Sequence, residues 1–266
     1  MKAFTLCSFF LIFFSLLSAE NITLTSSLTC EVTPPMLKAK LLLRNDGVAA
    51  AYNIQARFHT TDKQWLSKVF PKLLPDQELT IEYLEKLELE KNGVYPLIVK
   101  IHFKDAGGYP MTTVIVNPFT YEEITSPNIY GKLEKLALSN SGELRLDITN
   151  SGYFDLNLDI NIFVPDEISV QQTLTQRVLK GRSKMDHRFE LKNFSALAGA
   201  IYPVWAIIEY EREDKHFTSV CSGEIEIIRS ENMFKKYWWL WLSLAGTIVA
   251  LFIWLNLKTR SKPTKH

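Results

Sequence analysis

The stretch LLLRNDGVAAAYNIQARF, Leu41 to Phe58, is matched later in the chain by LDITNSGYFDLNLDINIFV, Leu146 to Val164. The sequence Asn45-Asp46-Gly47 of the first stretch recurs as Asn150-Ser151-Gly152, at an offset of 105 residues. A period near 100 residues is that of a repeated domain and is too long for a solenoid unit. The chain is therefore expected to contain two copies of one domain.

A second pair of segments supports the repeat. GVYPLIVKIHF, Gly93 to Phe103, matches AIYPVWAIIEY, Ala200 to Tyr210, with the Tyr-Pro pairs offset by 107 residues. Apolar residues alternate along both segments, and this period of two is typical of a β-strand with one buried face. The alternating residues are Leu97, Val99, Ile101 and Phe103 in the first copy and Val204, Ala206, Ile208 and Tyr210 in the second.

The segments after the two Asn-x-Gly turns also alternate. Their inward positions are Tyr52, Ile54, Ala56 and Phe58, matched by Leu158, Ile160, Ile162 and Val164 at an offset of 106. The change from 105 to 106 places one extra residue in the second copy just after Gly152, which predicts a β-bulge there. Leu79 to Glu90 is ambiguous between strand and helix; we favour a strand followed by a loop.

Strands punctuated by short Gly-containing turns, with little helix, indicate an all-β fold of two tandem Ig-like antiparallel β-sandwiches. We place the first sandwich at 20–119 and the second at 120–230. The boundary falls in Asn117 to Tyr130, where two prolines interrupt the strand pattern. So short a linker restricts the movement of the two domains relative to each other.

These turns resemble those of the CARDB-like group of Ig-like domains in exported bacterial and archaeal proteins. The shared features are the Asn-x-Gly strand end, a later Leu-x-Pro-Gly-like turn at Leu73 to Glu78 and, more weakly, at Val178 to Ser183, and a Gly-x-Tyr-like strand start. Asp76 stands where the family often has Gly, and the second copy lacks the Pro. The resemblance covers most of Cys30 to Ile228 and implies an adhesion or spacer module without catalytic residues.

The two ends of the chain predict export and membrane anchorage. Residues 1–19 have a cation, an apolar run and small residues, the layout of a signal peptide, although an uncleaved anchor is the alternative. Tyr237 to Leu257 contains no charged residue and is long enough for a transmembrane helix; a buried helix of a soluble domain is the alternative. The basic tail 258–266 would lie in the cytoplasm. The expected membrane-interface anchors are Tyr237, Trp238, Trp239, Trp241 and Trp254.

Charge limits the expected partners. The signal and the tail carry five of the 30 basic residues and none of the 29 acidic ones, which leaves the intervening region a net charge of about −4. Such a surface repels phosphate backbones, so nucleic acid is not an expected partner. We expect a single-pass cell-membrane protein with its bulk outside the cytoplasm, in the periplasm, and a membrane or envelope protein as its partner.

The sequence offers no catalytic, cofactor or metal site. The five histidines lack metal-ligand spacing, and none of the common nucleotide-binding, hydrolase or zinc motifs occurs. We therefore expect a protein that is not an enzyme and needs no cofactor. Cys30 and Cys221 could form one disulfide in an oxidising compartment or remain two separate buried thiols.

Three apolar residues fall where the strand pattern predicts solvent, namely Ile98, Trp205 and Ile207. They could form a partner-binding patch, since aromatic anchors dominate interfaces. The favoured alternative is that the neighbouring domain or a long loop covers this face. The leading function is non-catalytic protein–protein interaction or scaffolding in the cell envelope; the alternative is a receptor for a glycan or small ligand.

Overall fold

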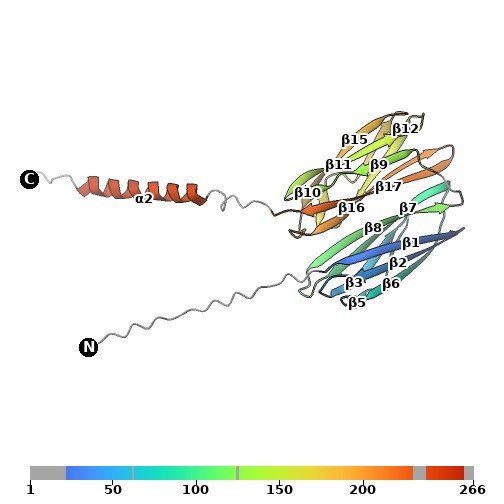
Figure 1. The fold of residues 1–266 in the computed structure, drawn as a ribbon, viewed down its shortest axis with the longest axis horizontal. Helices are drawn as coiled ribbons and strands as arrows, with labels where there is room; N and C mark the ends of the chain where they lie inside the picture. Colours follow the sequence, from blue (N-terminus) through green and yellow to red (C-terminus); the bar gives the residue numbers. More distant parts are fainter. Residues whose placement is uncertain (1–21, 62, 124–125, 230–237, 261–266) are drawn as a thin grey trace, which may run out of the picture.

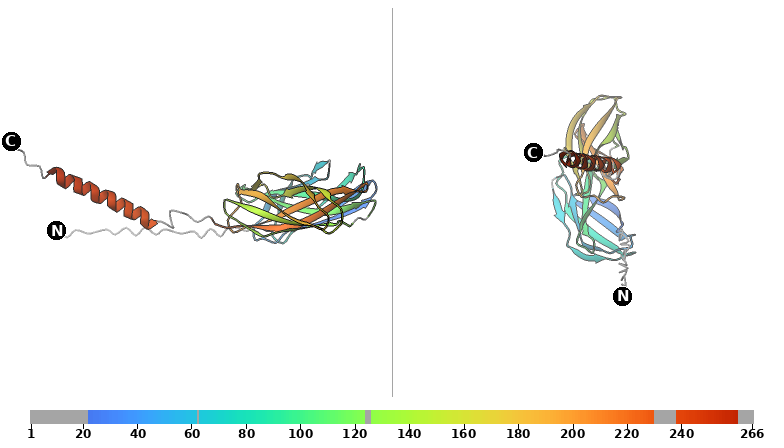
Figure 2. Two further views of the ribbon diagram at one scale, coloured as in Figure 1. Left: turned by 90° about the horizontal axis from the view of Figure 1, so that it is seen from above. Right: turned by 90° about the vertical axis from the view of Figure 1, so that its left-hand side faces the viewer.

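The computed structural model describes residues 22–61, 63–123, 126–229 and 238–260. Its strands form two halves that lie side by side (Figure 1), as the view along the long axis also shows (Figure 2, right). The prediction of an all-β sandwich fold is confirmed. The predicted signal peptide at 1–19 lies outside the described residues.

The first half has eight strands among the described residues. They are β1 (Leu24–Thr33), β2 (Met36–Asn45), β3 (Ala51–His59), β4 (Gln64–Leu66), β5 (Phe70–Leu73), β6 (Glu78–Lys86), β7 (Asn92–Lys104) and β8 (Pro110–Tyr121). One sheet has the order β1-β2-β6, and β3, β4, β5, β7 and β8 form the facing layer. The segment from Leu79 is a strand, as favoured from the sequence.

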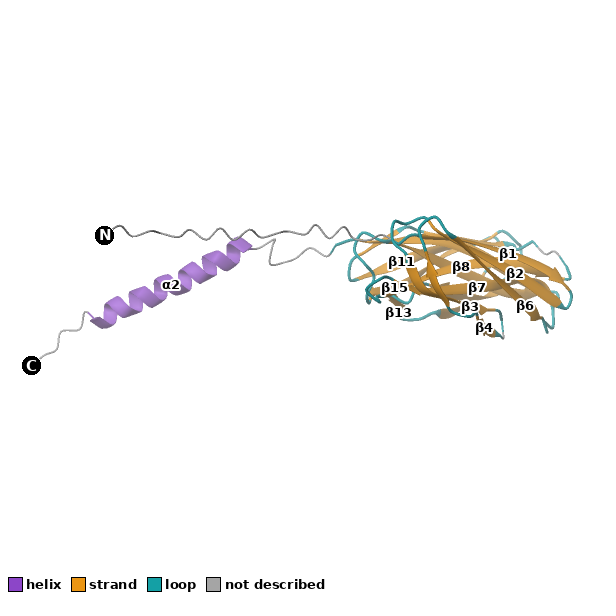
Figure 3. Cartoon of the chain, turned by 90° about the horizontal axis from the view of Figure 1, so that it is seen from below, coloured by secondary structure: helices purple, strands orange, loops and turns teal. Residues whose placement is uncertain are grey.

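The second half repeats this plan. Its strands are β9 (Ile129–Leu133), β10 (Leu136–Leu138), β11 (Ser141–Asn150), β12 (Leu156–Phe163), β13 (Ile168–Val170), β14 (Leu174–Leu179), β15 (Lys184–Asn193), β16 (Ile201–Arg212) and β17 (Lys215–Ile227). One sheet has the order β13-β15-β11-β9, and β14, β12, β16 and β17 form the other layer with β10. Figure 3 shows that strands make up nearly all of the regular structure in this part of the chain.

Each half buries its own core, because the strands alternate as predicted. In the first half the core side chains of β2 are those of Leu37, Ala39, Leu41 and Leu43. In the second, the equivalent strand β11 contributes Leu144, Leu146 and Ile148. Large aliphatic side chains buried this completely contribute roughly 1.5–3 kcal/mol each to folding.

The predicted bulge after Gly152 is wrong. The irregularity lies in the first copy, where the β3–β7 register shifts between Tyr52 and Gln55 and Asn53 adopts φ 52°. Asn tolerates this left-handed conformation better than most residues do. The extra residue shifts the alternation, so Ala51 points into the core and Tyr52, predicted to point inward, is only partly buried.

The two halves run in opposite directions. Strand β17 is parallel to β7 and antiparallel to its neighbour β16, so β7 and its counterpart β16 point opposite ways. The Asn45 turn therefore lies at the end from which both termini leave, and the Asn150 turn lies at the far end (Figure 1). We call this far end of the second half the distal end.

Candidate functional site

The three residues of the predicted patch lie in the contact between the two halves. Ile98 is 5% exposed and Ile207 is completely buried, and both pack with Val114 in a cluster separate from the two cores. The half-buried Trp205 joins them, and its Nε1–H donates to the carbonyl oxygen of Val114 at 2.9 Å. The neighbouring domain thus covers this face, as in the favoured alternative, and the residues are not a free patch.

Near the distal end the two halves share backbone pairing. Lys215 and His216 of β17 pair with Asn92 and Gly93 of β7, which joins the strands into a ten-stranded sheet. Gly93 has φ +145°, and a Cβ there would stand 1.9 Å from the His216 carbonyl oxygen. Only glycine allows this approach.

Side chains reinforce the pairing. The Thr218 hydroxyl donates to the Val94 carbonyl oxygen at 2.7 Å, and the His216 ring stacks on Tyr95 with centroids 4.2 Å apart. Lys91 also forms an ion pair with Glu211 across the contact. These contacts fix the angle between the halves at this end.

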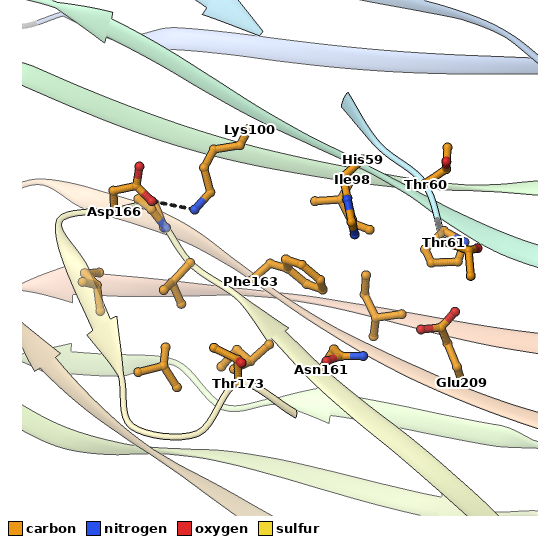
Figure 4. A pocket seen from close by; sticks show the side chains of 17 residues that line it. His59, Thr60, Thr61, Ile98, Lys100, Asn161, Phe163, Asp166, Thr173 and Glu209 are labelled. Carbon is orange, nitrogen blue, oxygen red and sulfur yellow. Dashed lines mark hydrogen bonds and ion pairs between the residues drawn. The ribbon is translucent and has the colours of Figure 1, made fainter. Parts of the chain in front are cut away.

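The loop after β12 provides a second set of contacts. Asp166 accepts from the Lys100 ammonium at 2.6 Å (Figure 4). Glu167, 3% exposed, accepts through Oε1 from the backbone N–H of Thr112 at 2.6 Å. The Tyr109 hydroxyl donates to the carbonyl oxygen of Ser195. The sequence did not predict a role for this loop, because its carboxylates contact residues of β7 and β8 that lie more than 50 positions earlier in the chain.

A cleft of about 550 Å³ lies between the halves (Figure 4). Ile98 and Phe163 contribute apolar surface from opposite halves, and His59 and Glu209 contribute polar groups. Burial lowers the pKa of His59, and its Nδ1 is buried without a hydrogen-bond partner in the described part of the chain. The cleft has the volume of a small-molecule site.

Within the described residues, no three His, Cys, Asp or Glu side chains lie close enough to hold a metal ion. Asp186 and His187, adjacent in sequence, lie on strand β15, where successive side chains point to opposite faces. No cofactor-binding residue is assigned.

Comparison with known proteins leaves the family open. No family model matches the chain, and no curated protein matches it. Among solved structures, a mutant α2-macroglobulin of Salmonella is similar over 79% of this chain and 16% of that one, with 10% identity and a TM-score of 0.33. The PapD-like domain 7 of human CEP192 is similar over 42% of this chain and 96% of that one, with 10% identity and a TM-score of 0.30. The CARDB-like resemblance has no support from a family model.

Cys30 and Cys221 are free thiols and lie in different halves, so the structure shows no disulfide between them. Cys221 is buried in the second core against Gly131, where a Cβ would stand 2.4 Å from its Sγ. Cys30 packs against the first core and meets Asn117. Burial raises the pKa of both thiols to about 11.

We expect both thiols to resist alkylation in the folded protein. The thiolate is the reactive form, and at about pH 8 a thiol of raised pKa supplies little of it. Iodoacetamide followed by mass spectrometry should find Cys30 and Cys221 unmodified in the native chain and both modified in denaturant. Rapid labelling of either thiol in the native chain, or a disulfide in non-reducing peptide maps, would contradict this.

Burial raises the pKa of Glu167, whose Oε2 has no partner among the described residues. The folded chain therefore binds the Glu167 proton more tightly than the unfolded chain does. As the pH rises from the ordinary glutamate pKa of 4.5 to the higher pKa of the folded chain, Glu167 lowers the free energy of unfolding. We expect the stability of Glu167→Gln, relative to the unaltered protein, to increase over that range in urea unfolding. Exposed Glu190, changed to Gln, is the control; a pH-independent difference for Glu167→Gln would refute the argument.

A helix forms at the predicted C-terminal position, α2 (Trp238–Arg260). Trp238, Trp239 and Trp241 are exposed on it, while Tyr237 and the Trp254 side chain lie outside the described part. Over the described residues, no helix has both the length and the apolar character required to cross a membrane. The predicted transmembrane span is therefore not supported by the structure.

Proposed function

We propose that the chain is a non-catalytic protein whose two Ig-like sandwiches act as one rigid unit in protein–protein interaction or scaffolding. The observation that carries the proposal is the contact between equivalent hairpins, β7–β8 of the first half and β16–β17 of the second. A unit with a fixed angle loses less conformational freedom on binding than two domains on a flexible linker. It also holds a partner at a defined distance.

The turn motifs that resemble CARDB-like domains belong to this proposal, because that resemblance implies adhesion or spacing. Sandwich edges add a plausible mode of binding. Strand β14 pairs only with β12 among the described strands, so its other edge offers backbone groups to which an extended segment could add.

Location is a further part of the proposal. Only the sequence supports this part: the uncharged stretch Tyr237–Leu257 and the basic tail 258–266 favour anchorage in a cell membrane, with the sandwiches exported, although helix α2 as described does not meet the requirements for crossing a membrane. Protease treatment of intact cells and of lysed cells tests it. Degradation of the sandwiches by protease added outside intact cells whose outer layers have been made permeable supports export. Protection of the sandwiches in those cells, with degradation only after lysis, contradicts it.

Crosslinked purification of the full-length chain from its native membranes tests the interaction itself. We expect a protein partner recovered in near-equal amount. The variant Ile207→Asp, which disrupts the contact between the halves, should recover less of the partner, because the rigid unit is lost. Ile201→Asp, changed at a position 57% exposed on the same strand, should recover as much as the unaltered chain. Repeated recovery of the chain alone would contradict the proposal.

A second candidate is binding of a small ligand in the cleft between the halves. The buried, unpartnered Nδ1 of His59 and the volume of about 550 Å³ favour it. A thermal-shift screen of sugars and small metabolites, repeated on His59→Ala, separates the candidates. A compound that raises the melting temperature of the unaltered protein but not that of His59→Ala would support binding of a small ligand in the cleft.

A further inference from the structure

Three loops converge at the distal end of the second half. They connect β11 to β12 (151–155), β14 to β15 (180–183) and β16 to β17 (213–214). We call them the distal loops. Both termini leave from the opposite end (Figure 1), so this end is the part of the β-structure farthest from where the chain continues.

The first two distal loops hold each other in place. The N–H of Arg182 donates to the Gly152 carbonyl oxygen at 2.8 Å, and the N–H of Gly181 donates to Asp155 Oδ1 at 2.9 Å. A Cβ at Gly181 would stand 2.2 Å from the Tyr153 carbonyl oxygen. The surface is thus preformed, which lowers the entropic cost of binding.

Two aromatic rings are exposed on these loops. Tyr153 is 76% and Phe154 is 56% exposed. The guanidinium carbon of Arg182 lies 4.1 Å from the centre of the Tyr153 ring, and that of Arg212 lies 4.1 Å from the centre of the Phe154 ring. Arg212 is already paired with Glu213, whereas the Arg182 guanidinium, stacked on its ring, keeps its N–H edges free for carboxylate oxygens.

The charge on the second loop is unbalanced. Lys180, Arg182 and the adjoining Lys184 are exposed and take part in none of the ion pairs found among the described residues. A shallow groove of about 490 Å³ begins at Lys184 and continues past Tyr130 and Lys132. Asp147 and Asp186 line this groove as well, so the unbalanced cations are those of the second loop itself, which contacts the exposed Tyr153 ring through Arg182.

The equivalent loops of the first half differ in each of these respects. There Arg44 is neutralised by Asp46, Asp76 and Glu78. The most exposed apolar side chain of that turn is Val48, at 80%. The repeated fold alone therefore does not require exposed rings beside unpaired cations.

We propose that the distal loops bind an acidic segment of a partner protein. Its carboxylates pair with Lys180, Arg182 and Lys184, and its apolar side chains contact the exposed rings. Charge complementarity selects this occupant, because Lys180, Arg182 and Lys184 have no ion-pair partner among the described residues. Of the carboxylates nearby, Glu213 is already paired with Arg212 and Asp155 accepts from the N–H of Gly181. The inference rests on the proposed interaction function and names its surface.

Fluorescence anisotropy tests the chemistry on the full-length chain in mild detergent. The probe is a short labelled peptide that alternates Glu and Leu, compared with its Gln counterpart. We expect the acidic peptide to bind more tightly, with affinity that falls as salt rises. Changing both Lys180 and Arg182 to Glu should weaken it by roughly tenfold or more, whereas changing Arg188 and Lys192 to Glu on the same sandwich should not.

Equal binding of the acidic and Gln peptides, or an unaltered affinity in the Lys180/Arg182 variant, would overturn the inference. Binding of anionic lipid vesicles or of single-stranded DNA without binding of the peptide would overturn it as well. Each of these results identifies a different ligand for the cations.

Site-specific photocrosslinking in cells separates this inference from the proposed function. A photoreactive phenylalanine analogue replaces Tyr153, and Val48 is replaced as the control in the equivalent loop. A protein crosslinked at 153 and not at 48 supports the inference. A partner captured by the chain but never crosslinked at 153 overturns the inference alone, and the absence of any partner overturns the proposed function too.

Discussion

Asn150→Ala should lower the free energy of unfolding by about 2–4 kcal/mol. The side chain is 1% exposed, and its amide donates to the carbonyl oxygens of Phe154 at 2.8 Å and Lys180 at 3.1 Å. Its Oδ1 accepts from the N–H of Gly152 at 2.9 Å. Alanine would leave these part-buried backbone groups without their side-chain partner, and the loss of several such bonds at once is costly.

The same residue occurs at the same place in the other half. Asn45 is completely buried. It donates to the carbonyl oxygens of Ala49 at 2.8 Å and Leu73 at 3.1 Å, and it accepts from Gly47 N–H at 3.1 Å. Asn45→Ala should therefore have an effect of similar size in the first half.

Urea unfolding of the full-length chain measures both effects. Asn157→Ala is the control for Asn150→Ala, because Asn157 is an exposed asparagine of β12, and its replacement should change stability by about 0.5 kcal/mol or less. A similar small change for Asn150→Ala would show that the Asn-x-Gly turn is only a local sequence preference.

Ile207→Asp should separate the two halves while leaving their cores folded. Ile207 is completely buried in the cluster between the halves and belongs to neither main core. An aspartate there would be a buried charge without a partner, with a cost of about 3–5 kcal/mol. We expect the radius of gyration from small-angle scattering to rise and thermal unfolding to divide into two transitions.

Ile201→Asp serves as the matched control, since Ile201 lies on the same strand and is 57% exposed. It should keep the scattering profile of the unaltered chain. Complete unfolding of Ile207→Asp would show that the halves cannot fold apart, and an unchanged profile would show that the contact contributes little to the arrangement.

The sequence predicted the strands well where burial on one face imposes a period of two. The phase of Leu97 to Phe103 and of Val204 to Tyr210 is as expected, and each of these residues lies in a core. Such strands carry their own signal, because each inward residue must be apolar. The two Asn-x-Gly turns predicted the repeat for a similar reason, since in each copy the buried asparagine amide forms hydrogen bonds with the backbone of the turn.

Other features had no local signal. The bulge in β3 follows from Asn53 taking a left-handed conformation, which an asparagine tolerates but does not require. Asp166 and Glu167 look like ordinary loop carboxylates until the fold brings them to Lys100 and Thr112. The distal loops carry no local sequence signal, because Tyr153 and Arg182 are distant in sequence and are brought together by the β12–β14 pairing.

The central claim is that the two sandwiches form one rigid unit, and an electron–electron distance measurement tests it most directly. Spin labels would replace Lys38 of β2 and Lys192 of β15, which are exposed on different halves. Cys7 and Cys30 are first changed to serine and the buried Cys221 to alanine. The account predicts a single narrow distance distribution that broadens in Ile207→Asp. A broad distribution in the otherwise unaltered chain would contradict it.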